Sequence, residues 1–151
     1  MGRRSRPDAG ALAAVLGVIV VDSSVWIEHL RDRETPPVLM LRRLLRGETA
    51  GPIMVGDLVM YEVLAGLRSA RAAREIRELL ETLLLVSMVD FDLVERAVAH
   101  YQTLRRRGIT PGTVDMIIGT YCIETGAELL TADRDFGPMR DHLGLRLVES
   151  A

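Results

Sequence analysis

The 151-residue chain contains no lysine, because all 19 of its basic residues are arginine. This argues against three classes of protein whose chemistry needs a lysine: a P-loop nucleotide site, a Schiff-base enzyme and a phospho-acceptor receiver domain. The formal net charge is −2, so no overall basic field indicates nucleic-acid binding. Any such binding must depend on local groups of arginines.

Cysteine is nearly as scarce. Cys122 is the only one and lies in an apolar, helix-like run, so the chain cannot form an internal disulfide bond. This favours a reducing, cytoplasmic setting and a packing role for the thiol. Histidine is sparse and scattered, at His29, His100 and His142. We therefore predict neither a zinc site nor a Ser-His-Asp triad.

The first residues are basic and the next are apolar, a pattern that a signal peptide also has. No small-residue cleavage site follows, and cleavage near Val21 would delete a strand that the core needs. The apolar run is also too short, and too interrupted by glycine, to cross a bilayer. We predict a disordered tail over residues 1–16, from a start codon assigned too early, and one domain over residues 17–151.

Apolar strand-like segments alternate with helix-like segments from residue 18 onward. Strands are predicted in VIVVD (18–22), PIMVG (52–56), LLLVSMV (83–89) and AELLT (127–131), with LRLVE (145–149) as a candidate fifth. Helices are predicted over 24–30, 37–47, 58–67, 70–84, 92–107 and 114–125. Because short apolar strands are separated by helices, we predict a three-layer α/β/α domain around a mostly parallel sheet of four to five strands.

Five acidic residues are predicted to gather at one edge of this sheet. Asp22 closes the first strand, and Asp133 and Asp135 follow the fourth. In such sheets, ligands bind outside the carboxyl ends of the strands. Asp115 is expected in the first turn of a helix that begins on the same side. Glu62, about one turn into its own helix, has the longer side chain needed to reach that crevice.

Carboxylates that converge without an interleaved cation repel one another, and their pKa values rise. A divalent metal ion would remove this repulsion. Because the candidate ligands are oxygens, with no cysteine and no suitably spaced pair of histidines, we predict one or two Mg²⁺ or Mn²⁺ ions rather than zinc.

Each acidic residue also has a structural alternative. Asp22 could cap the helix that follows it, although Ser23 and Ser24 are available for that purpose, so we favour a functional role. Asp115 would be stabilised by the helix dipole in a first turn whether or not it binds a metal. Glu62 could be a surface glutamate, but its apolar neighbours argue against full exposure.

Four motifs, VVDSSVWIE, YEVLAG, TVDMIIG and LLTADRDF, occur in an order that resembles the PIN-domain family, and most closely the VapC-type toxins of bacterial toxin–antitoxin pairs. The likeness covers residues 18–148. It implies a metal-dependent endoribonuclease whose acidic positions correspond to Asp22, Glu62, Asp115 and Asp133. Asp135 is a further candidate ligand, since either acid of the DRD sequence could bind the metal.

The resemblance also implies metal-assisted hydrolysis of RNA phosphodiesters, such as those of tRNA or rRNA. Asp22, Asp115 and Asp133 would hold the metal, and Glu62 would be a ligand or orient the attacking water. The sequence departs from the family pattern in its long tail and at Asp57, where similar proteins commonly carry serine or threonine. We predict a helix N-cap there.

Arginines around the acidic centre are expected to form a basic rim for RNA phosphates. Arg68, Arg71 and Arg134 are the candidates, although the spacing of the first two would also suit a helix face in water. The RRR sequence at 105–107 ends a predicted helix, where the dipole accounts for positive charge as well as RNA binding does.

The implied partner is a VapB-type antitoxin that lies along an apolar groove beside the first helix and sends an arginine toward the acidic site. Trp26 and Leu30 are candidate antitoxin contacts, with core packing as an equal alternative for Trp26. We also predict a homodimer and no membrane association. Two other functions stay open: an RNA-processing PIN nuclease without a toxin role, and a non-catalytic α/β signalling domain with an acidic pocket.

Overall fold

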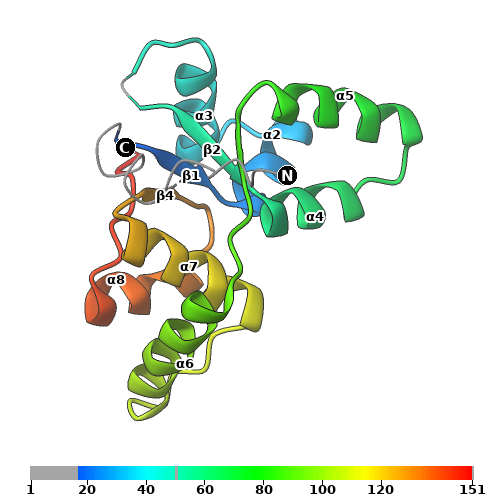
Figure 1. Ribbon diagram of the computed structural model, residues 1–151. Coiled ribbons are helices and arrows are strands. Elements are labelled where there is room, and N and C mark those ends of the chain that lie inside the picture. Colours follow the sequence, from blue (N-terminus) through cyan, green and yellow to red (C-terminus); the bar gives the residue numbers. More distant parts are fainter. Residues whose placement is uncertain (1–16, 50, 151) are drawn as a thin grey trace, which may run out of the picture.

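The computed structural model describes residues 17–49 and 51–150, so the predicted disordered tail lies outside the described residues (Figure 1). The strands are β1 (Ile19–Val21), β2 (Ile53–Gly56), β3 (Leu84–Val86) and β4 (Glu128–Leu130). The helices are α2 (Ser23–Leu30), α3 (Pro36–Leu45), α4 (Asp57–Ala65), α5 (Ala70–Glu81), α6 (Phe91–Arg105), α7 (Thr113–Thr125) and α8 (Gly137–Leu143), with a short 3₁₀ turn, η1 (Arg134–Phe136).

The strands form one parallel sheet in the order β3-β2-β1-β4. All three residues of β1 are buried, as expected for a central strand covered on both faces. The chain passes from β1 to β2 on one side, and β4 later joins β1 on the other. The strand order therefore reverses between β1 and β4. Open α/β sheets bind ligands at such a point, outside the carboxyl ends of the strands.

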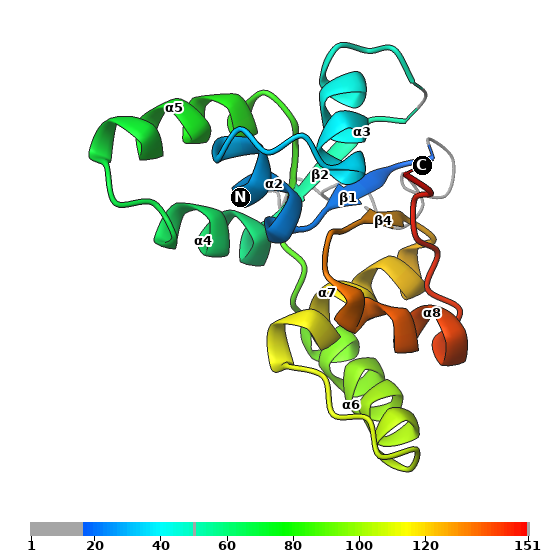
Figure 2. The same cartoon turned by 180° about the vertical axis from the view of Figure 1, so that it is seen from behind.

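Helices lie on both sides of the sheet, which confirms the predicted three-layer fold. α2 and α3 cover one face, and α7 and α8 lie on the other (Figure 1). α4 and α5 extend past the carboxyl ends of the strands beside α2, and α6 packs outside α7 (Figure 2). Within residues 17–49 and 51–150, no helix combines the length and the apolar character needed to span a membrane.

The placement of α7 decides where its acidic residue lies. Met116, Ile118 and Tyr121 are buried in the core, and Gly126 ends the helix in the left-handed conformation at φ 76°. Because α7 covers the sheet and leads directly into β4, it runs against the strand direction. Its first turn therefore lies at the carboxyl edge of the sheet.

Two predictions about the sheet need correction. The candidate fifth strand is only a single bridge between Leu129 and Leu147 within the described part of the chain. The helix predicted over 70–84 ends at Glu81, and the strand that follows is an edge strand. β3 pairs only with β2 in the described part of the chain, and its Leu84 and Leu85 are exposed by 37% and 53%.

Candidate active site

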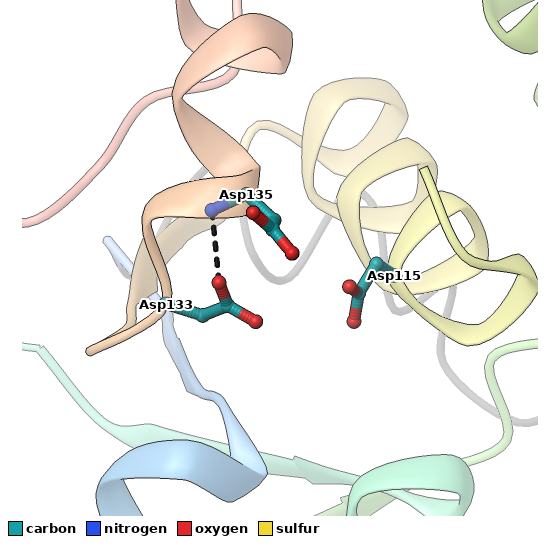
Figure 3. Close-up of side chains that lie close together, drawn as sticks. All are labelled: Asp115, Asp133 and Asp135. Atoms are coloured by element: carbon teal, nitrogen blue, oxygen red, sulfur yellow. Dashed lines mark hydrogen bonds between the residues drawn. The ribbon is translucent and has the colours of Figure 1, made fainter. Parts of the chain in front are cut away.

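Three aspartates meet at the reversal of the sheet. Asp115 comes from the first turn of α7, and Asp133 and Asp135 come from the turn after β4. Each offers a carboxylate oxygen, and these oxygens all lie within 4.8 Å of one another (Figure 3). The backbone N–H of Asp135 donates to Oδ1 of Asp133 at 2.8 Å, which fixes the turn that carries both. Both acids of the DRD sequence thus belong to this group.

Asp22 stands at the end of β1, in the N-cap position of α2, and is only 3% exposed. Two hydroxyl groups donate to its Oδ2: Ser24 at 2.6 Å and Thr131 at 3.0 Å. Its backbone N–H donates to the carbonyl of Leu130 at 2.9 Å, which joins β1 to β4. The carboxylate is therefore held in one orientation by a hydroxyl from α2 and a hydroxyl from the residue that follows β4.

The same hydroxyls also hold the loop that carries Asp133. The Oγ of Ser24 accepts from the backbone N–H of Ala132 at 3.1 Å, and Oγ1 of Thr131 accepts from the N–H of Asp133 at 3.0 Å. Both hydroxyls therefore receive a bond from the loop and donate one to Asp22. A single network fixes two acidic residues that are far apart in the sequence.

Glu62 is half-buried on α4, and its Oε1 accepts a hydrogen bond from Ser23 at 3.2 Å. Burial raises the pKa of Glu62, the bond from Ser23 opposes that rise, and the neighbouring charge of Asp22 adds to it. Glu62 thus lies close enough to Asp22 for the two charges to interact, as predicted from its position on the helix.

The other four carboxylates all act on Asp115. Burial, followed by the charges of Asp22, Asp133, Glu62 and Asp135, raises the pKa of Asp115 from 3.8 to about 6. The structure therefore brings together all five predicted acidic residues. Each of these charges makes ionisation of Asp115 harder, which is the repulsion expected of converging carboxylates.

Two opposing effects act on the pKa of Asp22. Burial raises its pKa, and the hydrogen bonds from Ser24 and Thr131 lower it in part. A buried carboxylate with hydroxyl donors on one oxygen is suited to bind a cation through the other, because the donors fix its direction.

The composition of the site fits a hard divalent cation. Every candidate ligand atom is a carboxylate oxygen, which Mg²⁺ and Mn²⁺ prefer. Among the described residues, the ion pairs of the protein all lie elsewhere and include none of the five acids. A positive ion in the crevice would therefore relieve a repulsion that the described side chains leave in place.

The predicted phosphate-binding arginines are exposed. Arg71 is on α5 and pairs with Glu75 at 3.0 Å, and Arg68 precedes that helix. Arg134 lies between Asp133 and Asp135 in the sequence and is the first residue of η1. Their role in RNA binding remains a prediction.

The two predicted antitoxin contacts differ in placement. Trp26 is fully buried. It is therefore a core residue, and its side chain offers no surface to a partner. The apolar pattern of α2 could not separate these cases, because a core face and a binding face are both apolar. Leu30 is 37% exposed, and Leu39 on α3 is 46% exposed.

Sequence reasoning assigned three site residues to other roles or overlooked them. Ser23 and Ser24 were expected to cap α2, but they lie inside its first turn and bind carboxylates. Thr131 was overlooked. The sequence holds one signal for these hydroxyl groups, which is their spacing from the acidic residues. Ser24 lies two positions after Asp22, and Thr131 lies two positions before Asp133.

Asp57 has a structural role, although it is not the N-cap. It is the first residue of α4, and the cap position belongs to Gly56. Its Oδ1 accepts from the backbone N–H of Leu58 at 2.9 Å and from that of Met88 at 3.2 Å. It thereby ties the start of α4 to the segment after β3.

The model of the PIN domain family matches residues 19–140. The chain therefore belongs to the PIN-domain family. Its curated relatives include ribonuclease VapC11 of Mycobacterium tuberculosis (strain H37Rv), which is 28% identical over 120 residues, covering 79% of this chain and 89% of the relative. The VapC ribonuclease Mb1587 of Mycobacterium bovis has the same identity and coverage.

Solved structures agree on the fold. VapBC2 from Rickettsia felis, bound to a DNA fragment from its promoter, has a TM-score of 0.69 at 13% identity and covers 87% of this chain and 97% of its own. VapC20 of Mycobacterium tuberculosis, a toxin that cleaves the sarcin-ricin loop, has a TM-score of 0.56 at 25% identity and covers 79% and 92%. The predicted resemblance to VapC-type proteins is confirmed.

Proposed function

We propose that this protein is a divalent-metal-dependent endoribonuclease that acts in the cytoplasm as the toxin of a toxin–antitoxin pair. The observation that carries the proposal is the convergence of five carboxylates at the point where the strand order reverses. The relatives named as VapC ribonucleases support RNA as the substrate class.

Asp22, Asp115, Asp133 and Asp135 would hold one or two Mg²⁺ or Mn²⁺ ions. A metal bound there would supply a water of lowered pKa and would stabilise the charge that develops on the phosphate and the leaving oxygen. The hydroxyls of Ser24 and Thr131 would keep the ligand oxygens in place during the reaction.

Glu62 would orient the attacking water or take up its proton. Its side chain is directed by the bond from Ser23, and its raised pKa makes it a better proton acceptor than an ordinary glutamate. Arg134, beside the acidic group, would contact a substrate phosphate, with Arg68 and Arg71 further along the RNA. The site would then be an acidic centre with a basic rim.

The test is cleavage of total cellular RNA, including tRNA and rRNA, by the purified chain. We expect cleavage with added Mn²⁺ or Mg²⁺, loss of cleavage with a chelator, and loss in an Asp22→Asn, Asp115→Asn double variant. Asp141→Asn is the matched control, because that exposed aspartate pairs with Arg140 away from the crevice. Cleavage by a folded double variant at the wild-type rate would contradict the nuclease proposal and leave the signalling alternative.

We further propose a VapB-type antitoxin as partner, bound beside α2 at a surface that includes Leu30. Co-expression with the neighbouring reading frame should relieve growth arrest and yield a complex. Leu30→Asp should weaken that complex without slowing RNA cleavage, whereas Leu85→Asp, at an exposed position on β3, should not weaken it. RNA cleavage without growth arrest or a co-purifying neighbour would favour an RNA-processing nuclease. We propose that the free toxin is a homodimer.

A further inference from the structure

One tyrosine of the helix that carries Glu62 has its ring in water. Tyr61 precedes Glu62 on α4 and is 71% exposed. Apart from Tyr61, the one exposed aromatic side chain of the described residues is that of Phe91 on α6. A single exposed aromatic residue is common on protein surfaces. Its surroundings therefore decide whether it has a binding role.

The position of Tyr61 on α4 places it next to the acidic group. Successive residues of a helix are turned by about 100°, so Tyr61 and Glu62 lie on adjoining faces. Leu58 and Ala65 are three or four positions from both and therefore border both faces. Because Glu62 accepts a hydrogen bond from Ser23 beside the crevice, the face that adjoins Tyr61 is the one that meets the acidic group.

α4 also lies between the two oppositely charged parts of the proposed RNA site. The start of α7, with Asp115, is on one side of α4, and α5, with Arg71, is on the other (Figure 1, Figure 2). Arg68 is exposed in the connection from α4 to α5. An RNA strand with one phosphate at the acidic group and others at these arginines would therefore cross α4.

The surface that α4 offers to such a strand is dominated by one flat ring. The exposed positions of α4 are Asp57, Tyr61 and Ala65. Asp57 accepts hydrogen bonds from the backbone N–H groups of Leu58 and Met88, and Ala65 presents no more than a methyl group. Tyr61 is thus the one large side chain of α4 that is open to a ligand without a structural bond to break. Unpaired bases stack on such rings whatever their identity, because every base has a π-face.

We propose that Tyr61 is a substrate-positioning residue on which an unpaired base of the RNA stacks, next to the phosphate at the acidic group. This inference rests on the proposed ribonuclease function and names the form of RNA that the site accepts. A base can stack on a side chain only when it is splayed out of a helix, so the site takes single strands or loops and not a duplex. The stacked base holds its neighbouring phosphate in place beside carboxylates that would otherwise repel it.

The first test is RNA binding by a protein that does not cleave, so that binding is measured apart from cleavage. Asp115→Asn serves as the parent, and the probe is a fluorescent single-stranded RNA of about 12 nucleotides at low salt. Adding Tyr61→Ala should weaken binding by about 5-fold to 150-fold, the range for loss of one base–aromatic stack. Adding Tyr61→Phe, which keeps the ring, should restore the affinity of the parent. Phe91→Ala, at the exposed ring on α6, is the matched control and should bind like the parent.

The second test separates stacking from a structural role of Tyr61. The same proteins are titrated with an abasic strand of equal length, which keeps the ribose and phosphate groups but offers no base. The parent should bind this strand more weakly than the normal one, and Tyr61→Ala should cause little further loss. A structural defect would instead weaken the binding of both strands alike. A duplex of the normal sequence should also bind more weakly than the single strand.

The outcomes distinguish this inference from the proposed function. Equal binding of the normal strand by the parent and by Tyr61→Ala, or an equal loss on the normal and abasic strands, would overturn the role of Tyr61 and leave the ribonuclease proposal standing. If Tyr61→Ala left RNA binding unchanged but weakened the complex with the proposed antitoxin, Tyr61 would belong to the partner surface and the inference would be wrong. A parent that bound no RNA would contradict both proposals.

Discussion

The first turn of α7 separates two surfaces with opposite chemistry. On one side Asp115 joins a group of carboxylates, and on the other Met116 and Ile117 line an apolar hollow. The acidic crevice is unfavourable because like charges are close and partly buried. The hollow and the exposed apolar residues of α6, Phe91, Val94 and Val98, are unfavourable because apolar surface faces water. A bound cation would relieve the first cost, and contact with further apolar side chains would relieve the second.

The two surfaces also differ in how each would select what binds to it. In the crevice, hydrogen bonds from Ser24 and Thr131 fix the direction of Asp22, and the loop of Asp133 is held by the same hydroxyls. On α6, the exposed side chains are apolar and form no directional bonds. Directional bonds suit a metal ion, whereas an apolar surface can only select by shape.

The largest effect is expected from removing one charge of the crevice. Asp115→Asn should reduce RNA cleavage to the level of a no-enzyme control, because asparagine keeps the shape but not the charge that holds a metal. The same variant should stay a dimer in sedimentation. Phe91→Asp, on the exposed side of α6, should leave RNA cleavage and Mn²⁺ binding unchanged. Loss of Mn²⁺ binding in Phe91→Asp would show that the two surfaces are not separable.

A smaller effect is expected from the hydroxyl network. Thr131→Val removes the donor to Asp22 and the acceptor for the N–H of Asp133 while keeping the size of the side chain. Loss of a group that orients a metal ligand typically weakens metal affinity by about 10-fold to 100-fold. Thr131→Ser should restore Mn²⁺ affinity in a calorimetric titration. Equal affinities for Thr131→Val and the wild type would show that this hydroxyl does not position the ligands.

A shift of a few degrees in the melting temperature is expected with pH. The pKa of Asp115 rises from 3.8 to about 6 on folding, so the folded state binds a proton more tightly than the unfolded chain between these values. The stability of the metal-free protein should therefore fall as the pH rises from about 4 to about 6 and should not recover above it. Asp115→Asn should remove this part of the pH dependence. If the difference in melting temperature between the wild type and Asp115→Asn stayed constant from about pH 4 to about pH 6, the raised pKa of Asp115 would be contradicted.

The smallest effect is expected at the basic rim. Arg134→Ala should raise the RNA concentration needed for half-maximal cleavage by a few-fold and leave the maximal rate nearly unchanged, because the arginine contacts phosphate rather than the reacting atoms. Arg33→Ala, at an exposed position after α2, is the control. The salt dependence of RNA binding should also become shallower. An unchanged RNA dependence would remove Arg134 from the substrate site.

The sequence was most informative where chemistry and topology coincide. Asp22 follows a strand that is apolar throughout, and this alone places it at the carboxyl edge of a parallel sheet. Asp115 could be placed there because its helix precedes the fourth strand. In both cases the prediction needed only the alternation of elements along the chain.

The contacts between distant residues could not be predicted in this way. The bond from Thr131 to Asp22 spans 109 positions and depends on the pairing of β1 with β4. The end of α5 was misplaced because Leu83 and Leu84 lie one helical turn after Leu79 and Leu80, so the apolar pattern of the helix continues past Glu81. Trp26 was ambiguous because periodicity identifies an apolar face but does not tell what covers it, as the exposed apolar residues of α6 also show.

The most direct test of the central claim is a calorimetric titration of the metal-free protein with Mn²⁺ at pH 7.0 (about one unit above the raised pKa of Asp115). The wild type and Asp141→Asn should bind Mn²⁺ saturably and gain thermal stability. The Asp22→Asn, Asp115→Asn double variant should fold but bind no Mn²⁺. Equal Mn²⁺ affinity in the double variant, or no binding by the wild type, would contradict a metal site formed by these carboxylates.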